Sequence, residues 1–185
     1  MENLNRDQEP VWYACYGSNL SSERFSYYIL GGEYNGHPYD GCDDKTLWSD
    51  STLMTFPGNI YFGNDSPRWH HGGVAFYDPS ADGKVLMRLY KITWGQLKDV
   101  QKQEGNSPTW YNDCHYLGDY EYYSPSCMDV FEQIPIFTLT SKELPFSNLP
   151  DDEYKELIVK ALYEECEMTE QDARRYLETG NLELL

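Results

Sequence analysis

The sequence is short of basic residues. Its 185 residues include 14 Lys and Arg against 31 Asp and Glu, a formal net charge of -17. Nucleic-acid binding relies on Lys and Arg to displace counterions from phosphates. An anionic membrane surface attracts polybasic segments for a similar reason. The charge balance therefore argues against both partners, but not against a small anionic substrate held by a few local donors.

Cysteine is also scarce, and long apolar runs are missing. The five Cys residues stand at positions 15, 42, 114, 127 and 166, without a CxxC pair. This pattern is typical of reduced thiols in the cytosol. The polar residues 1–10 lack the apolar centre of a signal peptide, and no apolar run has the length of a membrane span. We therefore expect a cytoplasmic protein that does not enter a membrane.

Aromatic residues are abundant, with 17 Tyr and 5 Trp in the chain. Buried phenol hydroxyls need partners, so much of the tyrosine is expected to be structural. The length and an apolar content of 40% suit one domain with a substantial core. We predict a flexible lead over residues 1–10 and a single domain over residues 11–185, with no internal repeat.

Hydrophobic periodicity predicts an α+β protein. A buried apolar-aromatic strand is expected over residues 11–16, and residues 33–52 are expected to form a long loop. The spacing predicts helices over residues 21–30 and 93–104, and a helical pair after residue 150. The first helix of this pair carries an apolar stripe at residues 154, 157, 158, 161 and 162. Thr169 is expected to cap the second helix, which should end near Gly180. Thr93 and Gln96 match a capping box. The remaining strands are expected over residues 52–56, 59–62, 73–77, 84–92, 116–123 and 130–140.

The first candidate for a functional site is the segment Tyr16-Gly17-Ser18-Asn19-Leu20. A strand that turns at glycine into a helix exposes successive backbone N–H groups, which favour a carboxylate or an oxyanion. Gly17 allows a ligand to approach the backbone closely. From the residues alone, an ordinary capped turn is an equally acceptable interpretation.

The second candidate is Glu104. Helical spacing places it on the same face as Leu97 and Val100, at the rim of the predicted core and before Gly105. A partly desolvated carboxylate there can take up and return a proton. The alternative is a frayed glutamate of the last helical turn that faces water.

Metal ligation is not expected. His70 and His71 are adjacent, and neighbouring residues in a strand point to opposite faces. The acidic loop with Asp40, Asp43 and Asp44 lacks the EF-hand pattern, and no HExxH spacing occurs. A Cys114–His115 pair is a weak candidate, because neighbours in a strand rarely serve each other.

At these residues the sequence resembles the γ-glutamylcyclotransferase-like family. The segment YGSNL at residues 16–20 is similar to the opening motif of that family, and Gln103-Glu104-Gly105 resembles the segment with its catalytic glutamate. Residues 72–76, 88–93, 150–158 and 173–177 resemble its central hairpin and C-terminal helices. The likeness extends from about residue 11 to residue 180.

The resemblance implies a small mixed barrel-like β-sheet with flanking helices, and release of 5-oxoproline from a γ-glutamyl amide without cofactor or metal. Glu104 would be catalytic, and Tyr16, Gly17, Ser18, Asn19 and Leu20 would bind the substrate. The implied partner is a small γ-glutamyl compound. Long segments over residues 32–51 and 106–119 depart from the family pattern and indicate a divergent branch. A binding protein on the same scaffold and a different amide or acyl-transfer activity are the alternatives.

Overall fold

The computed structural model describes residues 6–104, 114–117, 130–141 and 144–185. These residues form two compact units that share several strands. The first unit takes its described residues from Met1–Ala14, Glu23–Thr52 and Leu89–Leu139. The second takes them from Cys15–Ser22, Leu53–Arg88 and Thr140–Leu185. Each unit is described below by itself.

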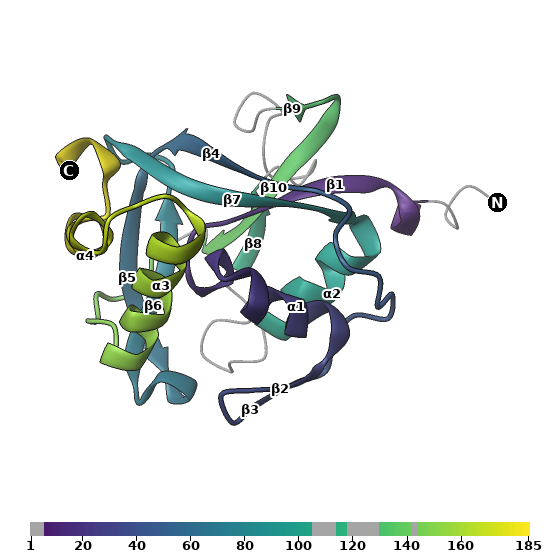
Figure 1. Cartoon of the computed structure of the whole chain (residues 1–185), viewed down its shortest axis with the longest axis horizontal. Helices are drawn as coiled ribbons and strands as arrows, with labels where there is room; N and C mark the ends of the chain where they lie inside the picture. Colours follow the sequence, from purple (N-terminus) through teal and green to yellow (C-terminus); the bar gives the residue numbers. More distant parts are fainter. Residues whose placement is uncertain (1–5, 105–113, 118–129, 142–143) are drawn as a thin grey trace. The chain divides into compact units, whose positions relative to one another are not determined.

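Figure 1 labels the strands and helices of the chain. The strands of the main sheet pair in the order β4-β7-β1-β10-β8, with β9 on β10. Strands β1 and β10 are parallel, whereas the separate pair β5–β6 is antiparallel. The fold class predicted from the sequence, α+β with a mixed sheet and flanking helices, is confirmed. The strands and α-helices are β1 (Pro10–Cys15), α1 (Ser22–Leu30), β2 (Gly32–Tyr34), β3 (His37–Tyr39), β4 (Ser51–Pro57), β5 (Asn59–Ser66), β6 (Gly72–Asp78), β7 (Lys84–Thr93), α2 (Trp94–Glu104), β8 (Cys114–Leu117), β9 (Val130–Phe131), β10 (Ile134–Ser141), α3 (Asp152–Glu165) and α4 (Glu170–Thr179).

The first unit has an aromatic core. Phe25 of α1 lies with its ring centroid 4.2 Å from that of Tyr90 and 5.5 Å from that of Trp48. Such ring pairs add to the stabilisation that comes from apolar burial. The abundance of tyrosine is therefore explained in part by packing.

The predicted capping box at the start of α2 is confirmed. Thr93 N donates to Gln96 Oε1 at 3.0 Å, and Gln96 N donates to Thr93 Oγ1 at 3.2 Å. Gln96 is also buried, and its Nε2 donates to the carbonyl oxygens of Asp44 and Thr46. One side chain thus starts the helix and satisfies two loop carbonyls.

The expected loop over residues 33–52 begins with a hairpin instead. Strands β2 and β3 pair from Gly32↔Tyr39 to Tyr34↔His37. Asn35 and Gly36 form the turn with φ of 50° and 75°. An Asn-Gly pair is the strongest short-range hairpin signal because both residues tolerate positive φ. The prediction missed it because the flanking residues are polar and show no apolar alternation.

A second difference lies in the strand predicted over residues 130–140. The structure has two antiparallel strands, β9 and β10, with Glu132 and Gln133 at φ of 52° and 65° between them. The strand predicted over residues 116–123 coincides with β8 only at its start, and its later residues lie outside the described part. In the predicted lead, residues 6–8 form a short 3₁₀ helix, and β1 begins at Pro10.

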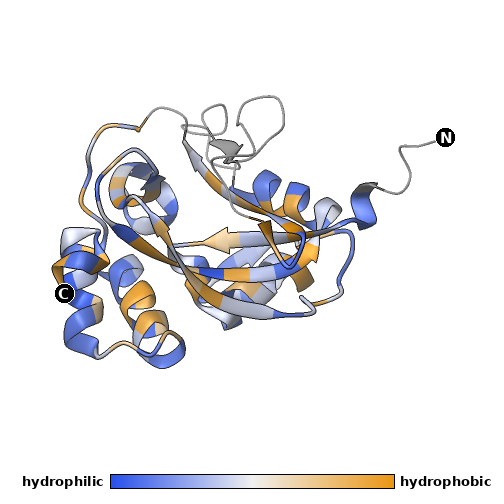
Figure 2. Cartoon of the chain, turned by 90° about the horizontal axis from the view of Figure 1, so that it is seen from above, coloured by the Kyte–Doolittle hydropathy of each residue, from blue (hydrophilic) through white to orange (hydrophobic). Residues whose placement is uncertain are grey.

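The second unit contains the β5–β6 pair and the two C-terminal helices. Tyr154, Ile158 and Leu162 of α3 are buried, which confirms the predicted apolar stripe. Thr169 caps α4 by accepting a hydrogen bond from Asp172 N, and Gly180 ends the helix in the left-handed conformation. Figure 2 shows apolar and polar residues mixed on these helices, as expected for amphipathic elements. Among the described helices, none combines the length and apolarity needed to span a bilayer.

Candidate functional site

Residues 16–20, the YGSNL segment that follows β1, all lie in the second unit. Residues 18–20 form a 3₁₀ turn directly after Gly17, and Ser18 and Asn19 are buried. Leu20 N donates to Gly17 O at 3.0 Å, so this N–H is engaged inside the turn. The side chain of Leu20 is fully buried in the core.

Gly17 lies in a closely packed turn. Its φ of -111° is accessible to any residue. A Cβ at this position would lie 3.2 Å from Ala75 Cβ and 3.2 Å from Tyr154 Oη. The same hydroxyl accepts a hydrogen bond from Ala75 N at 3.2 Å. Tyr154 thus holds β6 and borders the glycine turn, a role that its place in an apolar stripe did not reveal.

Replacing Gly17 with alanine is expected to destabilise the protein by about 1–3 kcal/mol, the usual cost of overpacking. The added methyl group would lie closer to two neighbouring atoms than an ordinary van der Waals contact allows. Urea unfolding followed by circular dichroism measures the change.

Tyr154→Phe provides the control for this prediction. It removes one of the two contacts, so Gly17→Ala should cost less in the Tyr154→Phe background than alone. Equal costs in both backgrounds would show that the phenol oxygen does not crowd the turn.

Tyr16 is buried beside Tyr77, with ring centroids 5.8 Å apart. Tyr77 is held in turn by β10, since its N donates to Thr140 Oγ1 at 3.0 Å. Burial, with Asp78 nearby, raises the pKa of Tyr77 to about 12. Tyr77 therefore stays neutral at physiological pH, and its ring packs beside that of Tyr16.

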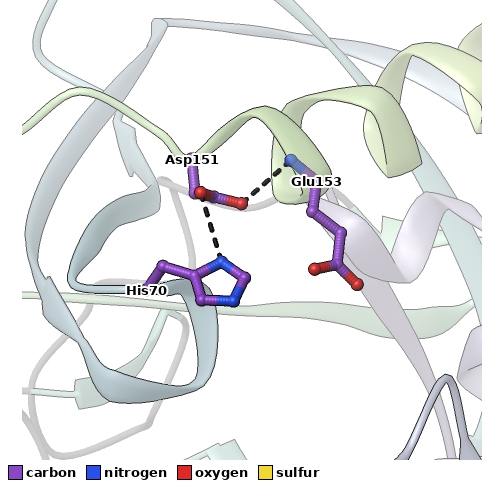
Figure 3. A group of neighbouring side chains, drawn as sticks. All are labelled: His70, Asp151 and Glu153. Carbon is purple, nitrogen blue, oxygen red and sulfur yellow. Dashed lines mark hydrogen bonds and ion pairs between the residues drawn. The ribbon is translucent and has the colours of Figure 1, made fainter.

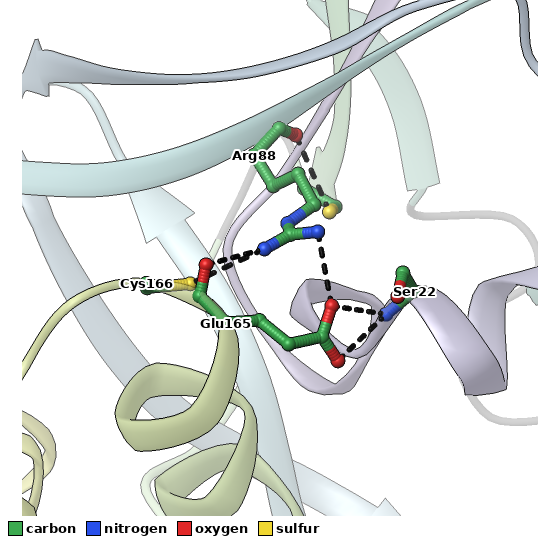
Figure 4. A network of polar contacts seen from close by, with 5 residues as sticks. Ser22, Arg88, Glu165 and Cys166 are labelled. Atoms are coloured by element: carbon green, nitrogen blue, oxygen red, sulfur yellow. Dashed lines mark hydrogen bonds and ion pairs between the residues drawn. The ribbon is translucent and has the colours of Figure 1, made fainter.

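A polar network that the sequence analysis missed begins at Ser22, just after the turn of residues 18–20 (Figure 4). The Glu165 carboxylate accepts from Ser22 N, the first N–H of α1, at 3.1 and 3.2 Å. Arg88 Nη1 lies 3.0 Å from Glu165 Oε2, and Arg88 Nη2 donates to Glu165 O at 2.7 Å. Negative charge at the start of a helix and positive charge at its end both interact favourably with the helix dipole. The chain thus supplies its own anion to the start of α1.

No sequence signal identified this network. Arg88 stands in a predicted strand and Glu165 in an acidic helix, where solvent exposure is the ordinary expectation. Their side chains are only 12% and 25% exposed. A single arginine amid the apolar strand residues of KVLMRLYKI was the one available hint.

Glu104 lies in the first unit as the last residue of α2 and is half-buried. Leu97 and Val100 of the same helix are fully buried, as the predicted face requires. The preceding Gln103 donates from Nε2 to Tyr28 O at 2.9 Å and accepts from Gly41 N at 3.2 Å. The last turn of α2 is therefore anchored through Gln103. Gly105 and residues 111–113 lie outside the described part, and so do the side chains of 114–117 and residues 118–123.

The thiols in the described part are unsuited to nucleophilic chemistry. Cys15, Cys42 and Cys166 are buried and free. Burial, with Asp99 nearby, raises the pKa of the Cys42 thiol to about 12. Burial also raises the pKa of Cys166. Because the thiolate is the reactive form, these residues act as core side chains. Cys114 and Cys127 lie outside the described side chains.

The acidic loop is used for local hydrogen bonds. Asp44 Oδ1 accepts from Thr46 N at 2.9 Å, and Asp40 O accepts from Lys45 Nζ at 3.2 Å. His70 and His71, in contrast, do not lie in a strand. Both adopt left-handed turn conformations, with φ of 49° and 65°. The argument that they point to opposite faces of a strand is therefore wrong.

Comparison with solved structures supports the fold. A gamma-glutamyl cyclotransferase superposes with a TM-score of 0.58 and 16% identity, over 94% of this chain and 89% of the other. An uncharacterized protein from Homo sapiens superposes with a TM-score of 0.60 and 19% identity, over the same shares. Identities this low show a shared fold and leave the activity open.

Comparison of sequences adds one relative. Histone deacetylase 5 from Arabidopsis thaliana is 30% identical over 200 residues, which cover 91% of this chain and 30% of that protein. The chain thus spans less than a third of the length of this curated relative. No protein-family profile matches the sequence. On the structural comparison, the chain has the γ-glutamyl cyclotransferase fold.

Proposed function

We propose that the protein releases 5-oxoproline from a γ-glutamyl amide. The observation that carries the proposal is the combination of the γ-glutamyl cyclotransferase fold with YGSNL after β1 and a glutamate at the end of α2. In this proposal Glu104 is the catalytic residue. Tyr16, Gly17, Ser18 and Asn19 bind the substrate, and Leu20 supports their turn from the core.

The proposed reaction is an intramolecular substitution. The α-amine of the glutamyl group attacks its own γ-carbonyl carbon, the new C–N bond closes a five-membered ring, and the bond to the leaving amine breaks. The α-amine is an ammonium at neutral pH, so it must first lose a proton. The attacking nitrogen loses two protons, one before and one after the new bond forms. Glu104 accepts them one after the other and passes each to the leaving amine, which departs as an ammonium. Holding the nitrogen next to the carbonyl carbon supplies the remaining advantage, a proximity effect.

The turn at Gly17 suits the anionic parts of such a substrate. The first N–H groups of a 3₁₀ turn have no partner inside the turn and favour negative charge. Tyr154 and Ala75 keep this backbone in place from the other side of Gly17. In the proposal, the backbone N–H groups of Gly17 and Ser18 stabilise the oxyanion or the α-carboxylate. The buried side chains of Ser18 and Asn19 orient the substrate.

A 5-oxoproline release assay tests the proposal. The panel contains γ-glutamyl amino acids, γ-glutamylamines and glutathione, each compared with its N-acetylated form. Acetylation removes the nucleophilic amine, so cyclisation should stop while ordinary amide hydrolysis would continue. Release from one free-amine class is the expected result and identifies the leaving group. If the folded protein turns over none of these compounds, or if it also cleaves the acetylated forms, the proposed cyclotransferase activity is contradicted.

A further inference from the structure

A cluster of three potential metal ligands lies in the second unit, at the start of α3. Its members are His70, Asp151 and Glu153, whose ligand atoms all lie within 4.8 Å of one another. Figure 3 shows the imidazole and both carboxylates gathered beside the first turn of the helix. One imidazole nitrogen with two carboxylates is a donor set that suits Zn²⁺ and related divalent ions.

His70 and Asp151 form an ion pair whose spacing also fits two ligands of one ion. His70 Nδ1 and Asp151 Oδ2 are 3.3 Å apart. Charge-assisted hydrogen bonds are shorter, about 2.7–2.9 Å. Two ligands at normal zinc distances in a tetrahedral site are separated by about 3.3 Å. The neighbouring pair His71–Asp65, at 2.7 Å, has the ordinary hydrogen-bond length and serves as an internal comparison.

The two elements that carry the ligands are locked together. Asn148 Nδ2 donates to His71 O at 2.8 Å, and Gly73 N donates to Leu149 O at 2.8 Å. A Cβ on Gly72 would lie 2.5 Å from Asp151 N, so only glycine permits this approach. Asp151 is further oriented because its Oδ1 accepts from Glu153 N at 2.9 Å. The backbone next to His70 and the carboxylate of Asp151 are thus positioned before any ion arrives, which lowers the cost of binding.

The third ligand and the local charge complete the site. Glu153 is exposed on the first turn of α3, so its carboxylate can close on an ion through side-chain rotation alone. The partial positive charge of a helix N-terminus disfavours a cation by itself. Here Asp151, Asp152 and Glu153 place three carboxylates at that end, and they outweigh the half charge of the helix.

We propose that His70, Asp151 and Glu153 form a surface site for a divalent transition-metal ion such as Zn²⁺, with a fourth position open to water or an external ligand. The proposed cyclisation does not use this ion. The site is therefore independent of the proposed function, and either can fail without the other. Its closeness to the candidate substrate turn arises through Trp69, which precedes His70 and packs against Tyr154 with ring centroids 5.0 Å apart.

Calorimetric titration of the 185-residue chain with Zn²⁺, in excess Mg²⁺ to saturate oxygen-only sites, tests the proposal. We expect one site. His70→Ala and Glu153→Gln should each weaken it by at least about tenfold, as even outer-shell changes weaken metal sites by this much. His71→Ala is the matched control and should leave binding within about twofold, because His71 belongs to the hydrogen-bonded pair.

Titration with Co²⁺ provides a second readout that excludes the cysteines. Visible absorption bands of tetrahedral Co²⁺ without a thiolate charge-transfer band are expected, and the visible bands should be lost in His70→Ala. No binding, binding that survives His70→Ala, or a thiolate band would each overturn the assignment. All three variants change exposed or half-exposed side chains, and circular dichroism confirms that they remain folded.

Discussion

Glu104→Gln is expected to lower the rate of 5-oxoproline release by about 10²–10⁴-fold, the usual contribution of a positioned acid or base. Glutamine keeps the size of the side chain but cannot accept the proton of the attacking ammonium. The Gln103 contacts that anchor the last turn of α2 are unaffected. The loss should therefore appear in kcat with little change in KM. Steady-state kinetics with the substrate identified by the panel measures both.

Glu178→Gln is the matched control, because Glu178 is an exposed glutamate of α4. It should retain full activity, which separates loss of a base from loss of one negative charge on the surface. A Glu104→Gln variant with unchanged kcat would remove Glu104 from the proposed mechanism. It would then favour another base or a different amide chemistry.

Arg88→Met is expected to destabilise the protein by about 2–4 kcal/mol. The substitution keeps the apolar stem but leaves the Glu165 carboxylate without its cation and Glu165 O without a donor. The estimate lies somewhat below the value for a fully buried pair because Glu165 is a quarter exposed. Urea unfolding should show a lower midpoint at unchanged slope.

Two variants sharpen this prediction. Arg174→Met removes a bidentate but exposed pair with Glu156, and solvent screening should keep its effect on the midpoint small. The double variant Arg88→Met with Glu165→Met leaves no unpaired charge and should be more stable than Arg88→Met alone. If Arg88→Met matched Arg174→Met, the network would be no more important than a surface ion pair.

The sequence by itself determined the elements that depend on local signals. The capping box at Thr93, the cap at Thr169 and the glycine end of α4 were all predicted, and each is satisfied by groups a few residues away. Apolar periodicity located the buried faces of α2 and α3 in the same way. The resemblance of YGSNL and Gln103-Glu104-Gly105 to the γ-glutamylcyclotransferase-like family implied the fold that the comparison confirms.

Only the tertiary structure decided which distant groups meet. Tyr154 lies against Gly17, Glu165 receives the first N–H of α1 and the ion pair of Arg88, and His70 faces Asp151. Each of these contacts joins residues that lie 77 or more positions apart along the chain. Periodicity reports which face of an element is buried but carries no information on what the face buries against. For that physical reason the candidate base was visible in the sequence, whereas the residues that support the turn, and the proposed metal site, were not.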